Sequence, residues 1–290
     1  MNRRQFLTVL AGAAGAAVLA PRFSPRGESE SEGLVHHATW IMGQIANIWV
    51  HGLSEPHAQE AINAAFADMR ATEATWSSFR GDSELASVLA TRPGRSIRVT
   101  PEFAAGLEAA RSAWITTRGA FDPSVRPEGP APGMDAFVLE GSRLRRSSRE
   151  ASLDFGGIGC GLALDRAASV LRAHGVHQAL LELSGDFLAL GAPDGFAGWP
   201  LAAADPWTGE PTEAVFDLAH AALATSSVVE RRSILDPRSG RLAGHVAQAS
   251  VLAPSATWAD AWSTAAVVAP LEDLASDLAT FDRSGRLVRA

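Results

Sequence analysis

Four glycines lie within residues 156–161, in the stretch L-D-F-G-G-I-G-C-G-L-A-L-D that covers residues 153–165. Glycines let a backbone approach a ligand closely, and the free N–H groups at the start of a helix can bind an anion. The spacing fits neither common phosphate loop, because Leu162 stands where G-x-G-x-x-G needs its last glycine and the chain has no lysine for G-K-[ST]. The stretch predicts either a ligand loop of another kind or a tight strand-to-helix turn that binds nothing.

Asp260 and Thr264 are a second candidate for chemistry. A helix is predicted over residues 257–268, and residues four apart project from the same face of a helix. A carboxylate and a hydroxyl one turn apart are hard oxygen ligands that suit Mg²⁺ or Ca²⁺. The alternative is an exposed aspartate beside a threonine whose hydroxyl bonds to its own helix.

The elements that position these residues follow from apolar periodicity. A short apolar strand is expected before the glycines, and apolar residues at helical spacing over 164–171 predict a helix after them, with Gly175 as its C-terminal cap. Strands are predicted over 179–183 and 187–190, joined by a turn at 184–186.

The rest of the chain predicts further helices and strands. Helices are expected over 55–79, 83–89 and 101–117, the last with Thr100 as N-cap and Pro101 in its first turn. Trp76 and Phe79 are expected to close the first helix and to pack in the core. The remaining predicted strands cover residues 36–50, with an interruption at 42–44, and residues 199–204, 214–218 and 246–252.

Composition indicates an ordinary globular protein. The chain has 290 residues, of which 47% are hydrophobic and 20% charged, so it can bury a substantial core. Its net charge of −7 argues against nucleic-acid binding, and the arginines within 143–149 are expected on the solvated face of a hairpin. Cys160 is the single cysteine, which excludes an intramolecular disulfide and a metal site built from several cysteines.

The N-terminus predicts an exported protein. Arg3 and Arg4 precede a weakly apolar run over residues 7–20, which is typical of a Tat signal peptide and too short to span a bilayer comfortably. We therefore predict a signal peptide over 1–20 and a periplasmic location. Residues 21–33 are polar and rich in Pro, Gly and Ser, so they predict a flexible spacer before a folded domain over 34–290.

Eight short motifs resemble, in their order along the chain, those of the ApbE-type FAD:protein FMN transferases. The resemblance covers about residues 40 to 270 and is specific as an ordered set, although each motif alone is weak. The motifs are M-G at 42, S-S-F-R-G-D-S-E-L at 77–85, G-A-F-D-P-S-V at 119–125, the glycine stretch at 153–165, S-G-D at 184, A-T-S-S at 224, I-L-D-P-R-S-G at 234–240 and A-D-A-W-S-T at 259–264.

The resemblance implies Mg²⁺-dependent transfer of FMN from FAD to a Thr or Ser hydroxyl of a target protein, with AMP leaving. Mg²⁺ suits this chemistry because it takes oxygen ligands and shares its shell with substrate phosphates. The implied metal ligands are the Gly157 carbonyl, Asp260 and Thr264, and the implied partner is a flavin-accepting membrane or periplasmic redox protein. The implied flavin-site residues are Met42, Ser78, Phe79, Ala120, Phe121, Asp122, Asp154, Cys160 and Leu235.

Four features depart from the pattern of the family. Cys160 stands where the family usually has Lys, Gln44 replaces the customary Thr, and the segment between G-A-F-D-P and L-D-F-G-G is short. Ser233 replaces a histidine that is often assigned a catalytic role, and the loss of a general base can cost about 10² to 10⁴ in rate. Ser233 and nearby His245, whose imidazole could reach the same phosphate, are therefore the two candidate catalytic positions.

Three functions stay open from the sequence. The chain is a flavin transferase, or a catalytically weak homologue that binds FAD as a periplasmic flavin-binding or accessory redox protein, or a slow hydrolase of FAD. The resemblance implies a single α+β domain with mixed sheets covered by helices, whereas periodicity alone supports only alternating helices and strands. The resemblance places an FAD crevice between the N-terminal strands and the loop of residues 154–160.

Overall fold

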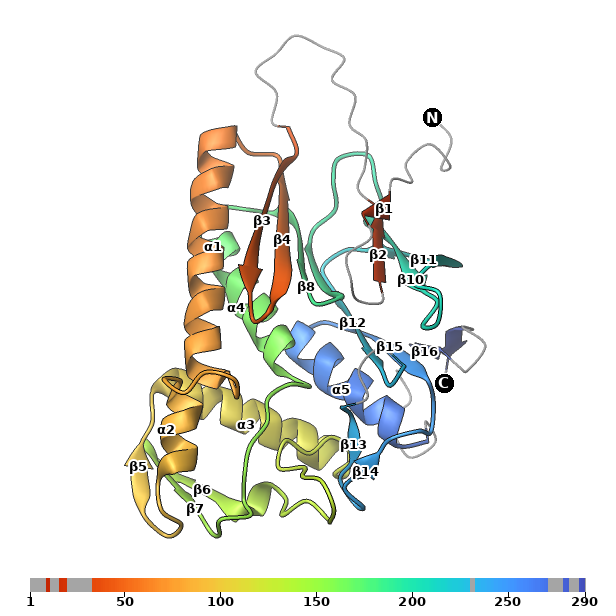
Figure 1. Ribbon diagram of the computed structural model, residues 1–290. Coiled ribbons are helices and arrows are strands. Elements are labelled where there is room, and N and C mark those ends of the chain that lie inside the picture. Colours follow the sequence, from red (N-terminus) through yellow and green to blue (C-terminus); the bar gives the residue numbers. More distant parts are fainter. Residues whose placement is uncertain are drawn as a thin grey trace.

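A six-stranded sheet organises the chain (Figure 1). The computed structural model describes residues 33–229 and 233–270, together with the strand residues 9–10, 16–19, 279–281 and 287–289. In spatial order the strands of this sheet are β15 (Gln248–Ala253), β12 (Ala222–Ser227), β9 (Asp186–Leu190), β8 (Gln178–Leu183), β4 (Gln44–His51) and β3 (Val35–Ile41).

Helices cover one face of this sheet. In Figure 1, α1 (Glu55–Trp76) and α4 (Gly159–Ala173) lie to the left of the strands, and α5 (Ala256–Val268) packs on β12 and β15. The apolar positions of α1 recur at helical spacing, so one stripe is buried against the sheet. Its buried side chains are Ala58, Ala61, Ile62, Ala65, Phe66, Met69, Thr72 and Trp76.

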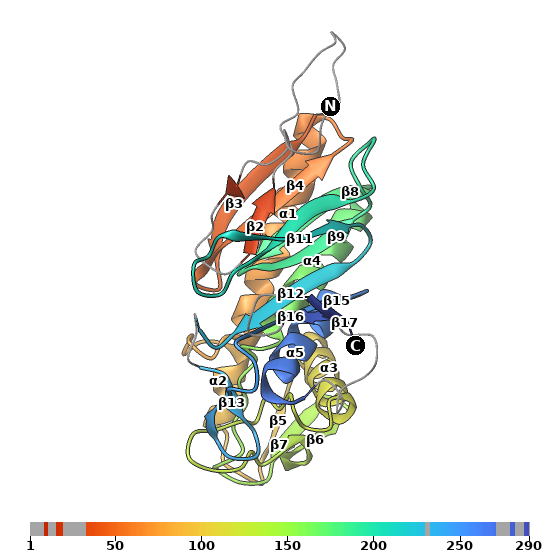
Figure 2. The ribbon, with the colours of Figure 1, turned by 90° about the vertical axis from the view of Figure 1, so that its right-hand side faces the viewer.

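A small sheet covers the opposite face. Strand side chains alternate between faces, so Ile48 and Val50 point toward the helices, whereas Trp49 joins a second apolar cluster with Trp199 and Leu218. The small sheet has the order β1 (Val9–Leu10), β2 (Ala16–Leu19), β10 (Trp199–Ala204) and β11 (Pro211–Leu218). The central strands of the large sheet are therefore buried on both sides, whereas the outer face at the β3 edge stays exposed at Trp40 and Ile45, and Figure 2 shows the strands side by side.

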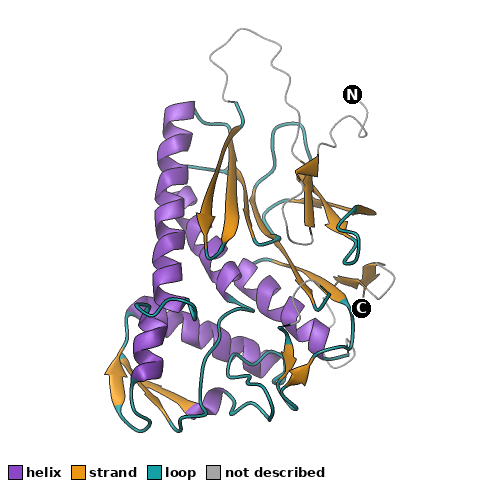
Figure 3. Ribbon diagram, in the orientation of Figure 1, coloured by secondary structure: helices purple, strands orange, loops and turns teal. Residues whose placement is uncertain are grey.

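A further group of elements gathers at one end of the molecule (Figure 3). They comprise α2 (Glu84–Ala90), α3 (Pro101–Thr116), the 3₁₀ turn η2 (Met134–Ala136) and the sheet of β5 (Ser96–Arg98), β7 (Arg143–Arg146) and β6 (Phe137–Glu140). The predicted caps are present: the Thr100 hydroxyl accepts the Phe103 N–H, and Gly175 has a φ of 76° after α4. Two further hairpins are β13 (Leu235–Asp236) with β14 (Arg241–Leu242), and β16 (Ala279–Phe281) with β17 (Leu287–Arg289).

The α+β prediction is confirmed, but four other expectations from the sequence were wrong. Each described strand pairing is antiparallel, whereas mixed sheets were expected. Residues 151–155 form no strand, because the Asp154 N–H bonds to the Pro123 carbonyl in a loop. Helix α1 ends at Trp76, so Phe79 lies beyond it and is 98% exposed.

The fourth expectation concerns the arginine run. Arg143 and Arg149 are exposed as expected, but Arg146 is half-buried and donates hydrogen bonds to the carbonyls of Leu89, Thr91 and Ala151. Leu89 and Thr91 lie at the C-terminal end of α2, and Ala151 lies just before the glycine stretch. Arg146 therefore ties the peripheral hairpin to the body of the fold.

The predicted signal peptide and spacer fall largely outside the described residues. Within 1–20 the structure describes β1 and β2, and β2 pairs with β10 from Val18↔Leu201 to Ala16↔Ala203. Of the spacer 21–33, Gly33 alone is described. Among the described helices, none combines the length and the apolar character needed to cross a membrane.

Candidate functional site

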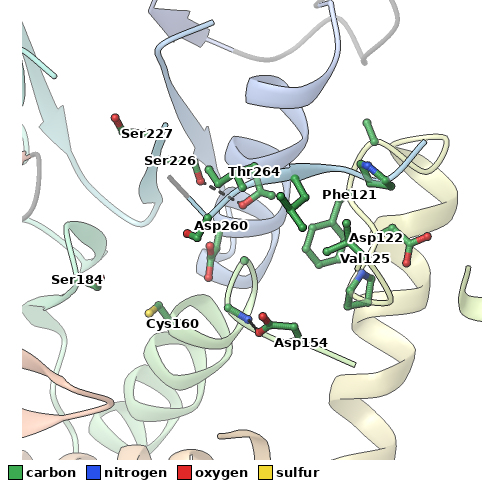
Figure 4. Close-up of a pocket in the computed structure, with 18 of the residues that line it drawn as sticks. Phe121, Asp122, Val125, Asp154, Cys160, Ser184, Ser226, Ser227, Asp260 and Thr264 are labelled. Atoms are coloured by element: carbon green, nitrogen blue, oxygen red, sulfur yellow. Dashed lines mark hydrogen bonds between the residues drawn. The ribbon is translucent and has the colours of Figure 1, made fainter. Parts of the chain in front are cut away.

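A pocket of about 350 Å³ lies where α4 and α5 begin (Figure 4). Seven segments far apart in the sequence form its wall: Phe79 after α1, the loop after α3, the glycine stretch, the β8–β9 turn, the end of β12, the segment around β13, and α5. The lining residues that recur below are Phe79, Phe121, Asp122, Asp154, Gly157, Cys160, Ser184, Asp186, Thr225, Ser226, Ser227, Ser233, Asp260 and Thr264.

The glycines allow α4 and α5 to approach each other. A Cβ at Gly161 would lie 2.3 Å from the Ala256 carbonyl oxygen, so any side chain there would force the two helices apart. The Gly161 N–H donates to the buried Asp260 carboxylate at 3.0 Å, while Ile158 and Gly159 donate to the Phe155 carbonyl. The Gly161 amide therefore joins α4 to α5, and the other two amides close the turn before α4, so all three already have protein acceptors.

Gly157, Asp260 and Thr264 meet on one side of the pocket. A Cβ at Gly157 would lie 2.8 Å from Thr264 Oγ1, so only glycine fits against this hydroxyl. Asp260 is 5% exposed and lies one turn before Thr264 on α5. Thr264 Oγ1 also lies 3.1 Å from the hydroxyl of Ser226. The arrangement places carboxylate and hydroxyl oxygens, donor types that Mg²⁺ prefers, beside the Gly157 backbone.

The loop after α3 builds the opposite wall. The Phe121 N–H donates to the hydroxyl of the buried Thr117, and this bond fixes the start of the loop. Asp122 Oδ1 accepts the N–H and the hydroxyl of Ser124. Burial raises the pKa of the Asp122 carboxyl, and the two bonds from Ser124 oppose that rise. Asp154 faces this loop and accepts the Gly156 N–H at 2.8 Å.

The described lining of the pocket is acidic. It includes Asp122, Asp154, Asp186 and Asp260, and none of the described lining residues is Lys, Arg or His. A diphosphate in such surroundings would face carboxylates without a basic partner, so it needs a cation to offset its charge. Among the described residues, no group of three or more His, Cys, Asp or Glu side chains forms a metal cluster. A cation here would rely on ligand oxygens as well as on protein oxygens.

Ten of the twelve predicted flavin-site and metal residues, Gly157 among them, line this pocket together. They are Phe79, Ala120, Phe121, Asp122, Asp154, Gly157, Cys160, Leu235, Asp260 and Thr264, joined by Ser233. The predicted crevice was misplaced in one respect, because β3 and β4 contribute no described residue to the lining. The β8–β9 turn and the end of β12 occupy that side instead.

Three predicted residues lie elsewhere. Met42 sits at the tip of the β3–β4 hairpin, where its N–H bonds to Glu73 of α1 and its side chain packs against the main core. Ser78 is exposed beyond the end of α1. His245 is also exposed, because Ala243 is held by its bond to the Ile234 carbonyl and the chain then turns outward.

Sequence reasoning did not single out Asp186 or the three hydroxyl residues that end β12, Thr225, Ser226 and Ser227. All four line the pocket. The only signal was their place in the S-G-D and A-T-S-S motifs, which gave no role to an individual side chain. Asp186 is buried at the start of β9, and its carboxylate accepts the Thr225 N–H.

A sequence match that covers most of the chain shows its family. Residues 42–131 and 129–284 match the ApbE family. The chain belongs to the ApbE family. This ApbE chain is 29% identical over 274 residues to the FAD:protein FMN transferase of Rhodobacter capsulatus, covering 82% of this chain and 52% of that relative. It therefore spans about half the length of that protein.

Two further ApbE relatives extend the comparison. The FAD:protein FMN transferase of Treponema pallidum (strain Nichols) is 26% identical over 282 residues, which cover 80% of this chain and 77% of the relative. The ApbE protein of Thermotoga maritima superposes with a TM-score of 0.79 at 23% identity, over 89% of this chain and 97% of that structure. The structural likeness establishes a shared ApbE fold.

Proposed function

We propose that this ApbE-family chain is a Mg²⁺-dependent FAD:protein FMN transferase that modifies a Thr or Ser hydroxyl of a periplasmic or membrane redox protein. The observation that carries the proposal is the convergence of residues from seven of the eight motifs on one pocket. The names of two relatives support the activity, since each is called an FAD:protein FMN transferase. The acceptor hydroxyl would form a bond to the phosphorus of the FMN moiety as the bond to AMP breaks.

The residues present fit a magnesium ion. Gly157, Asp260 and Thr264 would hold it, and they offer oxygen donors beside a pocket with four carboxylates. When bound, the ion would neutralise the diphosphate and stabilise the charge that develops on the phosphoryl oxygens. Phe121 and Phe79 present aromatic faces at the wall and mouth of the same pocket, where a planar flavin ring could pack.

The absence of a basic side chain from the described lining favours a second candidate, an FAD-binding protein with weak or no transferase activity. Ser233 lines the pocket and is exposed, but a serine hydroxyl does not accept a proton at neutral pH. The exposed His245 does not replace it. The four aspartates are the described lining groups that could act as a base in its place.

A single assay separates the two candidates. The purified protein is incubated with FAD, Mg²⁺ and a threonine-containing acceptor peptide, and mass spectrometry follows peptide that has gained one FMN less water. We expect slow transfer by the parent and a rise of about 10² or more for Ser233→His, because a general base contributes about 10² to 10⁴. FAD affinity should change little. Binding of FAD without product in either protein would instead establish the flavin-binding function.

We also propose that the protein is exported by the Tat route, on the basis of Arg3 and Arg4. Changing both arginines to lysine should leave the protein in the cytoplasm, as measured by cell fractionation and immunoblotting. Processed protein in the periplasm of this double variant would contradict a Tat route.

A further inference from the structure

We infer that Asp186 is a positioning residue of the pocket: its carboxylate holds the free end of β12 in the place from which Ser226 contacts Thr264. The inference deepens the proposed function and rests on it for the identity of the ligand, FAD. The contact itself belongs to the protein without ligand and can be tested alone.

The first step concerns the length of β12. Its register with β9 is Ala222↔Leu188 and Leu223↔Phe187, and β9 begins at Asp186, directly after the β8–β9 turn. Strand β12 continues to Ser227 and pairs over its whole length with β15. Thr225, Ser226 and Ser227 therefore extend past the β8–β9 hairpin and lie along the pocket, with a strand neighbour on one side only.

The second step concerns the Thr225 N–H, which points to the side where β9 has ended. A buried main-chain N–H without an acceptor is costly, and natural structures satisfy such groups almost without exception. Asp186 Oδ1 accepts this N–H at 3.0 Å. The Asp186 side chain thus takes the place of the main-chain carbonyl that a longer β9 would supply. The pocket occupies the space into which β9 would have extended.

The third step follows β12 one residue further. The Ser226 hydroxyl lies 2.8 Å from that of Ser263 and 3.1 Å from that of Thr264, and Ser263 also donates to the Asp260 carbonyl. Figure 4 shows the Ser226 and Thr264 hydroxyls facing each other across the pocket wall. Hydrogen bonds on either side of the Thr225–Ser226 peptide link therefore connect Asp186 to the residues that would hold the cation.

This role predicts that the position of the acceptor oxygen matters more than its charge. Asp186→Asn keeps an oxygen in the same place without the charge. Asp186→Glu keeps the charge but moves the oxygen by one methylene, in a site where the parent residue is 6% exposed. Asp205 supplies a matched control, since its Oδ1 also accepts main-chain N–H groups, those of Trp207 and Thr208, in an exposed turn outside the pocket lining.

The experiment compares Asp186→Asn and Asp186→Glu with Asp205→Asn and Asp205→Glu. Amide hydrogen exchange of the peptide that spans β12 is measured without ligand, and FAD affinity is measured by flavin fluorescence at saturating Mg²⁺. We expect Asp186→Asn to match the parent within about threefold in both readouts. Asp186→Glu should exchange the Thr225 amide faster and bind FAD at least about tenfold more weakly, as loss of a hydrogen bond to a charged group implies. Both Asp205 variants should match the parent.

Two results would overturn the inference. Weakening by Asn alone would show that the negative charge of Asp186 is needed and not its reach, and equal weakening by Asn and Glu would show that reach alone does not account for its role. Parent-like exchange of β12 in Asp186→Glu would show that the carboxylate does not hold the strand. If the parent itself fails to bind FAD, the proposed function fails, while the exchange data still decide whether Asp186 positions β12.

Discussion

Replacing Asp260 with asparagine is expected to weaken Mg²⁺-dependent FAD binding by at least about a hundredfold while changing stability little. The loss of a partner of a metal ligand already costs about 10- to 100-fold in metal affinity, and loss of the ligand itself should cost no less. Asp260 is the one carboxylate in the set of Gly157, Asp260 and Thr264. The fold should survive because an asparagine oxygen can still accept the Gly161 N–H.

Alanine at the same position is expected to do two kinds of damage. It removes the charge, and it also leaves the buried Gly161 N–H at the start of α4 without its acceptor. An unsatisfied buried donor costs about 1 to 3 kcal/mol, so Asp260→Ala should lower the free energy of unfolding by that amount. The contrast between the two variants separates the cation role of Asp260 from its structural role.

Flavin fluorescence with and without Mg²⁺ measures the first effect, and thermal unfolding measures the second. Thr264→Ser serves as a control that keeps the hydroxyl, whereas Thr264→Val should weaken FAD binding less than Asp260→Asn does, because a neutral hydroxyl contributes less than a charge. If Asp260→Asn binds FAD as tightly as the parent, with the same dependence on Mg²⁺, Asp260 is not a ligand.

The sequence predicted those parts of the site that depend on local spacing. Asp260 and Thr264 share a helix face because they are four residues apart, and the caps at Thr100 and Gly175 follow from residue type and helix pattern. The hairpin turn at Ser184 followed in the same way from two apolar runs joined by a short polar turn. All these features are decided within a few residues.

The sequence could not predict contacts between distant residues. Asp186 and Thr225 are 39 residues apart, and Gly161 and Asp260 are 99 apart, so no local pattern indicates their hydrogen bonds. Periodicity also does not report strand direction, so it could not correct the mixed sheets that the resemblance implied. The bond of the Met42 N–H to Glu73 on α1, outside the pocket lining, is another contact between distant residues.

The glycine stretch shows how one pattern can carry two physical meanings. Glycines before a helix are equally consistent with a phosphate loop and with a close approach of backbones. The structure favours the second meaning for Gly157 and Gly161, whose missing side chains make room for Thr264 and for the Ala256 carbonyl. The contribution of these glycines to the pocket is therefore to bring α5, with Asp260 and Thr264, up to the start of α4.

Asp165 on α4 also holds the start of α5 close to α4. Replacement of Asp165 by alanine is expected to be the most destabilising of the changes considered. Asp165 Oδ1 accepts the Ala256 N–H at 2.9 Å. Its Oδ2 accepts three bonds, from the Ser255 hydroxyl at 2.7 Å and from the N–H and hydroxyl of Thr257 at 2.9 and 2.6 Å. Helix α5 has no acidic residue in its own first turn, so Asp165 supplies the negative charge that its N-terminus favours.

Asp165→Ala should lower the free energy of unfolding by about 3 to 5 kcal/mol, because it removes a charged acceptor from four donors at a partly buried helix start. For a domain of this size that loss corresponds to a fall in Tm of about 6 to 20 °C. Asp68→Ala is the matched control. Asp68 of α1 forms a partly exposed ion pair with Arg166, which follows Asp165 on α4, and this pair should contribute at most about 1 kcal/mol. Calorimetry of the two variants measures both values. A Tm for Asp165→Ala equal to that of Asp68→Ala would mean that α5 is held against α4 by apolar packing and by the Asp260 bond to Gly161, without need of the Asp165 cap.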